Sequence, residues 1–526
     1  MTLSTPTTVR RSRLDALADA VVTVADRPSL AVESPFDAET VGEVPACSPD
    51  DVRDAFDRAR AAQAEWADRP LSERIAVFEE FHDRVLDEQS SLLDVVQAET
   101  GKARLDAHEE AVDVAATARY YANHARSYLA SRRRTGAVPL LTRTTEHRKP
   151  VGVVGVISPW NYPLTLSISD AVPALLAGNA VVCKPDEGTP FTALRIRELL
   201  VESGLPADLF AVVTGRGDEL GEALVSASDY VCFTGSTEVG RTVAATAGRN
   251  LVDCSLELGG KNPMLVLADA DVDAAAENAA HACFSNAGQL CLSVERIYVD
   301  ADVREAFLDA FVRETRRLTL GAGYGFDYDV GTLTSAAQLE KVEAHVEDAV
   351  DEGASVLTGG RRREDVGPYA YEPTVLTDVT EEMTCATEET FGPVVAVYEA
   401  SGIADAVERA NEGPHGLNAS VWSGDTARAE QVAERVDAGT VNVNDGYAAA
   451  WASLDAPMGG VGDSGIGRRH GEVGMTRFTE SQTVATQRGR PLTRPAEVPR
   501  RLWTLLLNAN ERLTSRLTAW RRGGGG

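Results

Sequence analysis

Short apolar runs separated by helix-length segments are the feature that most restricts how this chain of 526 residues can fold. Four of these runs cover residues 151–157, 180–184, 210–213 and 230–233. Their apolar side chains are nearly continuous, as in strands that are covered on both faces. The segments between the runs are long enough for crossover helices, so we expect a parallel sheet with helices packed on it.

A second series of the same kind follows residue 257. We expect strands at 263–267, 295–299, 393–398 and 440–443, and helices near 271–284, 302–317, 335–352 and 403–412. Before the first series, amphipathic helices are predicted at 50–66, 71–100 and 103–130. A chain of this length exceeds one hydrophobic core, so an α/β protein of two or three substructures is predicted.

The charge balance excludes one class of function. Asp and Glu number 80 against 51 Lys and Arg, giving a formal net charge of −29. Neutralising nucleic-acid phosphates requires a basic face, so no nucleic-acid partner is expected.

The basic residues are almost all arginines, because lysine occurs only at positions 102, 149, 184, 261 and 341. Many carboxylates with scarce lysine are typical of proteins from a salt-loaded cytoplasm, where salt screens the repulsion between surface charges. A halophilic, archaeal source is therefore expected. The alternative is a GC-rich genome that favours arginine codons.

Seven cysteines are scattered without paired spacing, which suits a reducing, cytoplasmic location. Residues 1–30 read as a polar leader without a signal-peptide core, and no apolar stretch is long enough to span a membrane. None of the eight histidines lies in a metal-binding spacing, so no metal is expected.

Three segments carry candidate chemistry. Cys291 ends the segment Phe-Ser-Asn-Ala-Gly-Gln-Leu-Cys, Glu257 begins Glu-Leu-Gly-Gly-Lys-Asn-Pro, and Asn161 lies in Pro-Trp-Asn-Tyr-Pro. A thiol nucleophile and a carboxylate base are the groups needed to form a thioester and hydrolyse it. Each motif alone is weak, since a lone cysteine is usually a small buried apolar residue.

In this order the motifs resemble the aldehyde dehydrogenase superfamily over about residues 30–490. The resemblance implies an α/β fold with a Rossmann-type cofactor domain, an α/β catalytic domain and a small oligomerisation sheet. It implies that Cys291 attacks an aldehyde, that Asn161 stabilises the oxyanion, and that Glu257 activates the hydrolytic water. The expected product is a free carboxylic acid.

The resemblance also implies a nicotinamide dinucleotide site. Gly235 and Ser236 lie where a strand enters a helix whose free N–H groups can bind pyrophosphate. Glu187 matches a position at the adenosine ribose. A carboxylate there accepts a hydrogen bond from the 2′-hydroxyl of NAD and repels the 2′-phosphate of NADP. NAD is therefore the expected cofactor, with NADP possible. The other matching positions are Trp160, Lys184, Glu389 and Phe391.

One pattern is rejected as a cofactor fingerprint. The sequence Gly-x-Gly-x-x-Gly occurs at residues 460–465, but no βαβ unit follows it. By resemblance, this segment is a loop near the entrance of the site.

The expected domain organisation follows the same resemblance. The cofactor-binding domain covers 31–257, with 131–146 contributing to the oligomerisation sheet, and the catalytic domain covers 258–445. Residues 446–475 return to the cofactor domain and 476–490 add an oligomerisation strand. Strand-like residues 139–144 and the segment 476–487 are expected to pair subunits, giving a homodimer or homotetramer.

The extension 491–526 is basic, with seven arginines against two glutamates. Trp503, Leu506, Leu513, Leu517 and Trp520 recur at helical spacing, which predicts an amphipathic helix within 494–522. We expect this helix to dock on the acidic body of its own chain or of a neighbouring subunit. The alternatives are an anionic membrane surface, or a chain that acts mainly as a membrane-associated or scaffolding protein.

The resemblance is nearest to the type 2 succinate-semialdehyde dehydrogenases, which makes succinate semialdehyde the expected small-molecule substrate. However, better-known succinate-semialdehyde enzymes have arginine where Ser285 lies here. An arginine clamp for a carboxylate contributes roughly 1.5–3 kcal/mol. The alternative is therefore a neutral aliphatic or aromatic aldehyde. Asp170 is another departure, because many relatives have lysine at that position.

Overall fold

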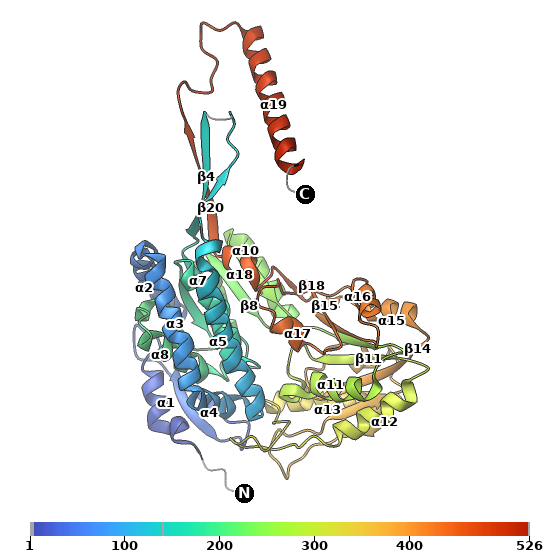
Figure 1. The fold of residues 1–526 in the computed structure, drawn as a ribbon. Helices are drawn as coiled ribbons and strands as arrows, with labels where there is room; N and C mark the ends of the chain where they lie inside the picture. The colour runs from blue at the N-terminus through green and yellow to red at the C-terminus, as the bar shows by residue number, and fades with distance from the viewer. Residues whose placement is uncertain (1–4, 139–140, 524–526) are drawn as a thin grey trace.

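The computed structural model describes residues 5–138 and 141–523, whose strands form two large sheets and a small projecting sheet (Figure 1). Two further antiparallel pairs are β1 (Ser29–Glu33) with β2 (Thr40–Pro45) and β15 (His415–Gly416) with β18 (Val461–Gly462). The first sheet has the order β19-β9-β8-β5-β6-β7, and all its strands are parallel except β19. Its strands are β5 (Val153–Ile157), β6 (Ala180–Lys184), β7 (Phe210–Val212), β8 (Tyr230–Thr234), β9 (Asp253–Glu257) and β19 (Gly465–Ile466). The prediction of a parallel sheet here is confirmed.

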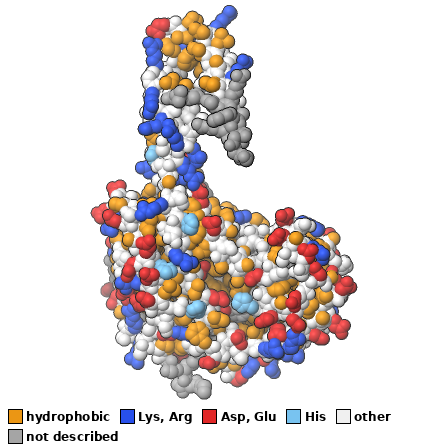
Figure 2. Space-filling view, in the orientation of Figure 1, with side chains coloured by type: hydrophobic (Ala, Val, Ile, Leu, Met, Phe, Trp, Pro, Cys, Tyr) orange, Lys and Arg blue, Asp and Glu red, His pale blue; other side chains and the backbone are white. Residues whose placement is uncertain are grey.

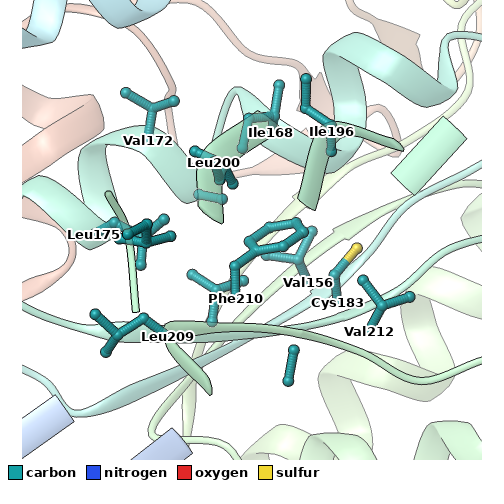
Figure 3. Packing of buried hydrophobic residues seen from close by; sticks show 14 of the residues in the cluster. Val156, Ile168, Val172, Leu175, Cys183, Ile196, Leu200, Leu209, Phe210 and Val212 are labelled. Atoms are coloured by element: carbon teal, nitrogen blue, oxygen red, sulfur yellow. The ribbon is translucent and has the colours of Figure 1, made fainter. Parts of the chain in front are cut away.

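Helices cover this sheet because its strands are apolar on both faces. Figure 3 shows Phe210 and Val156 of the sheet packed beneath Leu200 and Ile196 of α8. The helices that contact its strands are α2 (Pro49–Asp68), α7 (Ala171–Leu176), α8 (Pro190–Glu202), α9 (Gly217–Ala227) and α10 (Thr237–Asn250). The helices α3 (Leu71–Asp87), α4 (Gln89–Thr100), α5 (Arg104–Tyr128) and α6 (Pro163–Ile168) pack on α7 and α8.

The single helix expected over 71–100 is two helices. The chain leaves helical geometry at Glu88, which has φ −100° and ψ 14° and ends α3 before α4 begins. The carboxylate of Glu88 pairs with buried Arg195 of α8, so a tertiary contact accompanies the break.

The second sheet has the order β12-β13-β14-β11-β10-β16-β17 and is parallel except for β12. Its strands are β10 (Asn262–Val266), β11 (Val294–Asp300), β12 (Ser355–Thr358), β13 (Thr374–Thr377), β14 (Val394–Ala400), β16 (Asn418–Trp422) and β17 (Thr440–Val443). Its helices include α11 (Val272–Phe284), α12 (Arg304–Thr315), α13 (Ala336–Asp351), α15 (Ile403–Ala410) and α16 (Thr426–Ala433). The four expected strands and four expected helices are confirmed, and β12, β13, β16 and α16 are additional.

The two sheets meet in sequence between Glu257, the last residue of β9, and Asn262, the first of β10. The chain later returns to the first sheet, where β19 pairs antiparallel with β9. In the first thirty residues, α1 (Arg11–Ala18) buries Leu14 and Leu17 in the first core, so this segment is packed on the body.

The third sheet projects from the body and consists of β20 (Thr479–Gln487), β4 (Thr142–Pro150) and β3 (Arg132–Arg134), all antiparallel (Figure 1). The strand expected at 139–144 begins at Thr142, and residues 139–140 lie outside the described residues.

The predicted C-terminal helix is α19 (Arg500–Gly523), which stands beside the projecting sheet and away from the body (Figure 1). Asn510 Nδ2 of α19 donates to the carbonyl of Ala137 in the loop between β3 and β4, at 3.0 Å. Of the two docking places expected for this helix, the body of its own chain is not the one seen, and a neighbouring subunit stays a prediction. None of the helices in the described ranges is both long and apolar enough to cross a membrane.

Candidate active site

The nucleophile candidate Cys291 follows α11 in a tightly bent segment. Asn286, Ala287 and Gly288 have φ of 51°, 54° and 70°, in the left-handed region. A side chain at Gly288 would place its Cβ 2.1 Å from the carbonyl oxygen of Gly392, so only glycine fits there. The carbonyl of Cys291 accepts a hydrogen bond from Asn262 Nδ2 at 2.7 Å, which fixes the backbone of this cysteine.

Asn161 is held next to this segment. Its Nδ2 donates to the carbonyl of Gln289 at 3.0 Å, which leaves the second amide proton for another acceptor. Its own carbonyl accepts from Asn286 Nδ2 at 3.0 Å and from Lys102 Nζ at 2.7 Å. Asn161 is therefore oriented from both its side chain and its backbone.

Glu257 closes β9 and is buried, with 7% of its surface exposed. Burial raises its pKa to about 7, while the guanidinium of Arg469, 3.9 Å from Oε1, acts in the opposite direction. Burial, with the negative charges of Glu257 and Glu389, raises the pKa of the Cys291 thiol to about 12. The thiol is therefore protonated near neutral pH in this arrangement, and it has a carboxylate base nearby.

One cavity of about 200 Å³ brings most predicted site residues together. Its lining includes the three catalytic candidates Cys291, Glu257 and Asn161. It also includes the cofactor candidates Trp160, Gly235, Ser236, Glu389 and Phe391. Residues from both large sheets therefore converge on one space.

The wall opposite β9 is built by Glu389 and Phe391. Glu389 Oε1 accepts from the backbone N–H of Gly260 at 2.7 Å. Phe391 has φ 54°, and its backbone N–H donates to the buried carboxylate of Glu295 at 2.9 Å. This hydrogen bond fixes the backbone that carries the Phe391 ring. The ring stands edge-on to that of Trp160, with ring centroids 5.4 Å apart.

Lys184 and Glu187 lie apart from this cavity, at the carboxyl end of β6. Lys184 is buried, and its Nζ lies 3.4 Å from Glu187 Oε2, a half-exposed carboxylate. Ser236 caps α10 by accepting from the N–H of Val239. The start of α10 at Gly235 and Ser236 is uncovered, which suits a pyrophosphate. The Glu187 carboxylate beyond β6 suits a ribose hydroxyl. These residues therefore fit a dinucleotide.

A larger cavity of about 350 Å³ lies on the other side of the nucleophile's neighbours Leu290 and Leu292. Tyr162 lines it, and the buried Tyr162 hydroxyl has no hydrogen-bond partner among the described residues. The lining is His108, Glu109, Glu110, Val112, Asp113, Ala116, Tyr162, Thr165, Leu290, Leu292, Tyr447, Ala448, Trp451, Ala452 and Leu454. No lysine or arginine is present in that lining.

Ser285, the position of the missing arginine, is hydrogen-bonded to His281. Ser285 Oγ lies 2.9 Å from His281 Nδ1, and His281 Nε2 lies 3.2 Å from the hydroxyl of Tyr447. Of these three residues, Tyr447 lines the larger cavity, whereas Ser285 and His281 line a neighbouring one.

Sequence reasoning missed four residues that position the site: Lys102, Asn262, Glu295 and Arg469. Asn262 and Glu295 act through backbone contacts, which no sequence pattern shows. Lys102 carried a signal in the scarcity of lysine, since a chain that uses arginine nearly everywhere keeps lysine here. The described residues contain no cluster of three or more His, Cys, Asp or Glu able to hold a metal ion.

Comparison with known proteins assigns the chain to a family. The model of the aldehyde dehydrogenase family matches residues 22–484. The chain belongs to this family. As a family member it is an NAD(P)-dependent aldehyde dehydrogenase, an oxidoreductase acting on aldehydes.

Two curated relatives and one solved structure illustrate the similarity. A Mycolicibacterium smegmatis protein, provisionally named as an NADP(+) succinate-semialdehyde dehydrogenase, is 51% identical over 494 residues, covering 93% of this chain and 96% of that protein. The succinate semialdehyde dehydrogenase of Acinetobacter baylyi is 33% identical, covering 85% and 92%. The crystal structure of an NAD-dependent aldehyde dehydrogenase from Sinorhizobium meliloti superposes with a TM-score of 0.85 at 34% identity, covering 90% and 95%.

Proposed function

We propose that this aldehyde dehydrogenase oxidises succinate semialdehyde to succinate through a thioester on Cys291. The convergence of Cys291, Glu257 and Asn161 on one cavity is the observation that carries the chemistry. The substrate is supported by relatives of 51% and 33% identity that are named for it.

In the first step the Cys291 thiol loses its proton to solvent water and its sulfur attacks the aldehyde carbon; a C–S bond forms as the C=O π bond opens to an oxyanion. The second amide proton of Asn161 and the backbone N–H of Cys291 are the donors for this oxyanion. One such donor contributes about 2.7–4 kcal/mol at the transition state. When bound, a nicotinamide dinucleotide would supply the hydride acceptor for the oxidation.

Hydrolysis of the thioester is assigned to Glu257. Its carboxylate takes a proton from water, the resulting hydroxide attacks the acyl carbon, and the C–S bond breaks with return of a proton to the sulfur. A carboxyl whose pKa is about 7 is half ionised near neutral pH, which suits both taking up and returning this proton.

We further propose that NAD is preferred and NADP accepted. Glu187 favours a ribose 2′-hydroxyl, whereas its ion pair with Lys184 reduces the repulsion of a 2′-phosphate. The relatives include both kinds, one named for NADP(+) and one for NAD. Residues 31–257 and 446–475 then form the cofactor domain and 258–445 the catalytic domain.

His281 is the proposed partner of the substrate carboxylate in place of the missing arginine. The His281 ring is hydrogen-bonded to Ser285 and Tyr447, so it can orient these two hydroxyls towards a substrate carboxylate. A neutral aldehyde is the second candidate, because that cavity has an apolar lining with three carboxylates and without lysine or arginine.

The deciding experiment compares succinate semialdehyde with butyraldehyde, a neutral aldehyde of the same chain length, at high KCl with NAD and with NADP. Cys291→Ala is the blank. A kcat/KM at least tenfold higher for the semialdehyde supports the proposal, and equal or better use of butyraldehyde supports the neutral alternative. No turnover of either aldehyde would contradict the assignment of Cys291.

We also infer a cytoplasmic homodimer or homotetramer in a salt-tolerant cell. The seven cysteines are all unpaired, consistent with a reducing compartment. Figure 2 shows basic side chains gathered along the projecting sheet, whose strands β3 and β4 carry five arginines and Lys149. A second copy of this acidic chain is a complementary partner for that surface.

The helix α19 belongs to the same proposal. Leu502, Leu506 and Leu513 are about half exposed on it and recur at helical spacing. A neighbouring subunit is the proposed cover, and an anionic membrane or a scaffolding role is the alternative. Deletion of residues 494–526 should reduce the oligomer size seen by light scattering; loss of binding to phosphatidylserine vesicles with an unchanged oligomer would instead support the membrane.

A further inference from the structure

Four buried charges form a chain behind the proposed base. Glu257 Oε1 lies 3.9 Å from Arg469 Nε, and Arg469 Nη2 donates to Asp170 Oδ2 at 3.0 Å. Arg477 pairs with the other oxygen of Asp170. The four side chains are between 4% and 8% exposed, so solvent screens them little.

The chain is incomplete at its Glu257 end. Glu257 Oε1 and Arg469 Nε are both buried, and neither has a hydrogen-bond partner in the described part of the chain. Their separation of 3.9 Å is too long for a hydrogen bond but close enough for strong electrostatic attraction. A small rotation of the Glu257 side chain would form the bond, while the other end of the guanidinium stays on Asp170.

The backbone holds Arg469 firmly at this place. Met458 and Arg469 exchange both backbone hydrogen bonds, at 2.9 and 2.7 Å. Next to them Gly459 has φ 151°, and a Cβ there would lie 3.1 Å from Glu257 Oε1. The segment that supplies Arg469 therefore also packs its backbone directly against Glu257.

We propose that Arg469 is a positioning residue that orients Glu257 and sets its basicity, and that Asp170 limits this effect by holding Arg469. The proposal rests on the role given to Glu257 above. It also gives Asp170 a role: Arg469 supplies the cation beside Glu257, and the aspartate anchors that guanidinium.

The signs follow from simple electrostatics. Arg469 stabilises the ionised form of Glu257, and Asp170 opposes it both by its own charge and by drawing the guanidinium away. The charged or titratable groups that face Glu257 are Arg468, Arg469, Arg477, Asp170 and Cys291. Those that face the two arginines and Asp170 are Asp113, Tyr121, Tyr230, Cys232 and His470. Replacing Arg469 and replacing Asp170 should therefore move the pKa of Glu257 in opposite directions.

The test uses p-nitrophenyl acetate, whose acetyl group transfers to the Cys291 sulfur with loss of p-nitrophenolate and needs no nicotinamide. Hydrolysis of the acetyl-enzyme is then followed from pH 5 to 9 in Arg469→Gln, Arg469→Lys and Asp170→Asn. The exposed Arg249→Gln, which also loses one positive charge, is the matched control.

The measured quantity is the pH at which the rate of acetyl-enzyme hydrolysis falls to half as Glu257 becomes protonated. We expect this pH to rise by about one unit or more in Arg469→Gln and to return towards the wild-type value in Arg469→Lys. In Asp170→Asn it should fall. Asp170 keeps Arg477 when Arg469 is replaced, so that variant should fold, and an unchanged p-nitrophenolate burst would verify this. Shifts in the same direction, or no greater than in the control, would overturn the role of Arg469 alone. A wild-type enzyme without a burst would instead overturn the proposed function, and with it this inference.

Discussion

Replacement of Lys102 by methionine should destabilise the protein strongly, because it breaks an ion pair that is completely buried. Lys102 and Glu110 are both 0% exposed in their side chains, and Nζ lies 2.6 Å from Oε1. Glu110 Oε2 would keep the backbone N–H groups of Leu164 and Thr165, but Oε1 would lose its partner. Removing one member of a buried pair costs about 3–5 kcal/mol.

The pH dependence of this loss has a definite sign. Burial already raises the pKa of Glu110, and Lys102 is the group that lowers it most, so the pKa rises further in Lys102→Met. The unpaired carboxylate is costly only when ionised. The destabilisation should therefore be largest at pH 7 and above, and should shrink as the pH falls through the raised pKa of the folded state.

Denaturant unfolding at fixed KCl, at pH 7 and pH 5, measures this effect. Lys102→Met/Glu110→Gln should recover at least 2 kcal/mol of the loss at pH 7, since the neutral amide needs no counter-ion. The exposed Lys149→Met is the control. The reasoning would be refuted if the unfolding free energy of Lys102→Met lay within 0.5 kcal/mol of the wild-type value. It would also be refuted if the losses of unfolding free energy in the two single variants simply added in the double variant. Because the Asn161 carbonyl also loses its Lys102 donor, kcat should fall at least about tenfold, or 1.4 kcal/mol.

Three further predictions concern the site. Glu257→Gln should lower the pKa of Cys291 and speed its alkylation by iodoacetamide at pH 8, while turnover with aldehyde stops after one hydride transfer. Unchanged alkylation would contradict the effect of the Glu257 charge on the thiol. His281→Asn should raise KM for succinate semialdehyde about tenfold and leave butyraldehyde unaffected, whereas equal effects on both would indicate a structural role. Glu187→Gln should raise kcat/KM with NADP about tenfold relative to NAD, and a ratio that does not change would remove Glu187 from cofactor selection.

The strands that the sequence predicted well are those whose burial comes from apolar side chains. β6 and β10 are buried at every position. β16 is equally buried but was missed, because its sequence Asn-Ala-Ser-Val-Trp contains two polar residues. Asn418 and Ser420 are satisfied there by distant carbonyls, those of Leu292 and Asp445, and such tertiary partners cannot be foreseen from local pattern.

In the site, too, features carried by local sequence could be predicted, whereas those that depend on distant partners could not. The ordered motifs were enough to predict that Cys291, Glu257 and Asn161 share one space. The projecting sheet came from resemblance alone, because β4 has the sequence Thr-Arg-Thr-Thr-Glu-His-Arg-Lys-Pro with little apolar alternation. The departure at Asp170 was visible, but its partner Arg469 lies 299 residues away, so the charge network needed the fold.

Lysine usage links the composition of the surface to the chemistry of the site. Of the five lysines, three are buried, Lys102, Lys184 and Lys261, with 1%, 3% and 5% exposed. Each lies within 3.4 Å of a carboxylate, on Glu110, Glu187 and Glu295 respectively. An ammonium is a compact point charge, whereas the planar guanidinium is larger and has fixed donor directions, so arginine does not replace lysine in such closed positions. Each of the three has a structural role: Lys102 supports Asn161, Lys184 faces the proposed ribose site, and Lys261 binds the glutamate that holds Phe391. In a lysine-poor chain of this kind, the remaining buried lysines therefore indicate where the interior is under functional constraint.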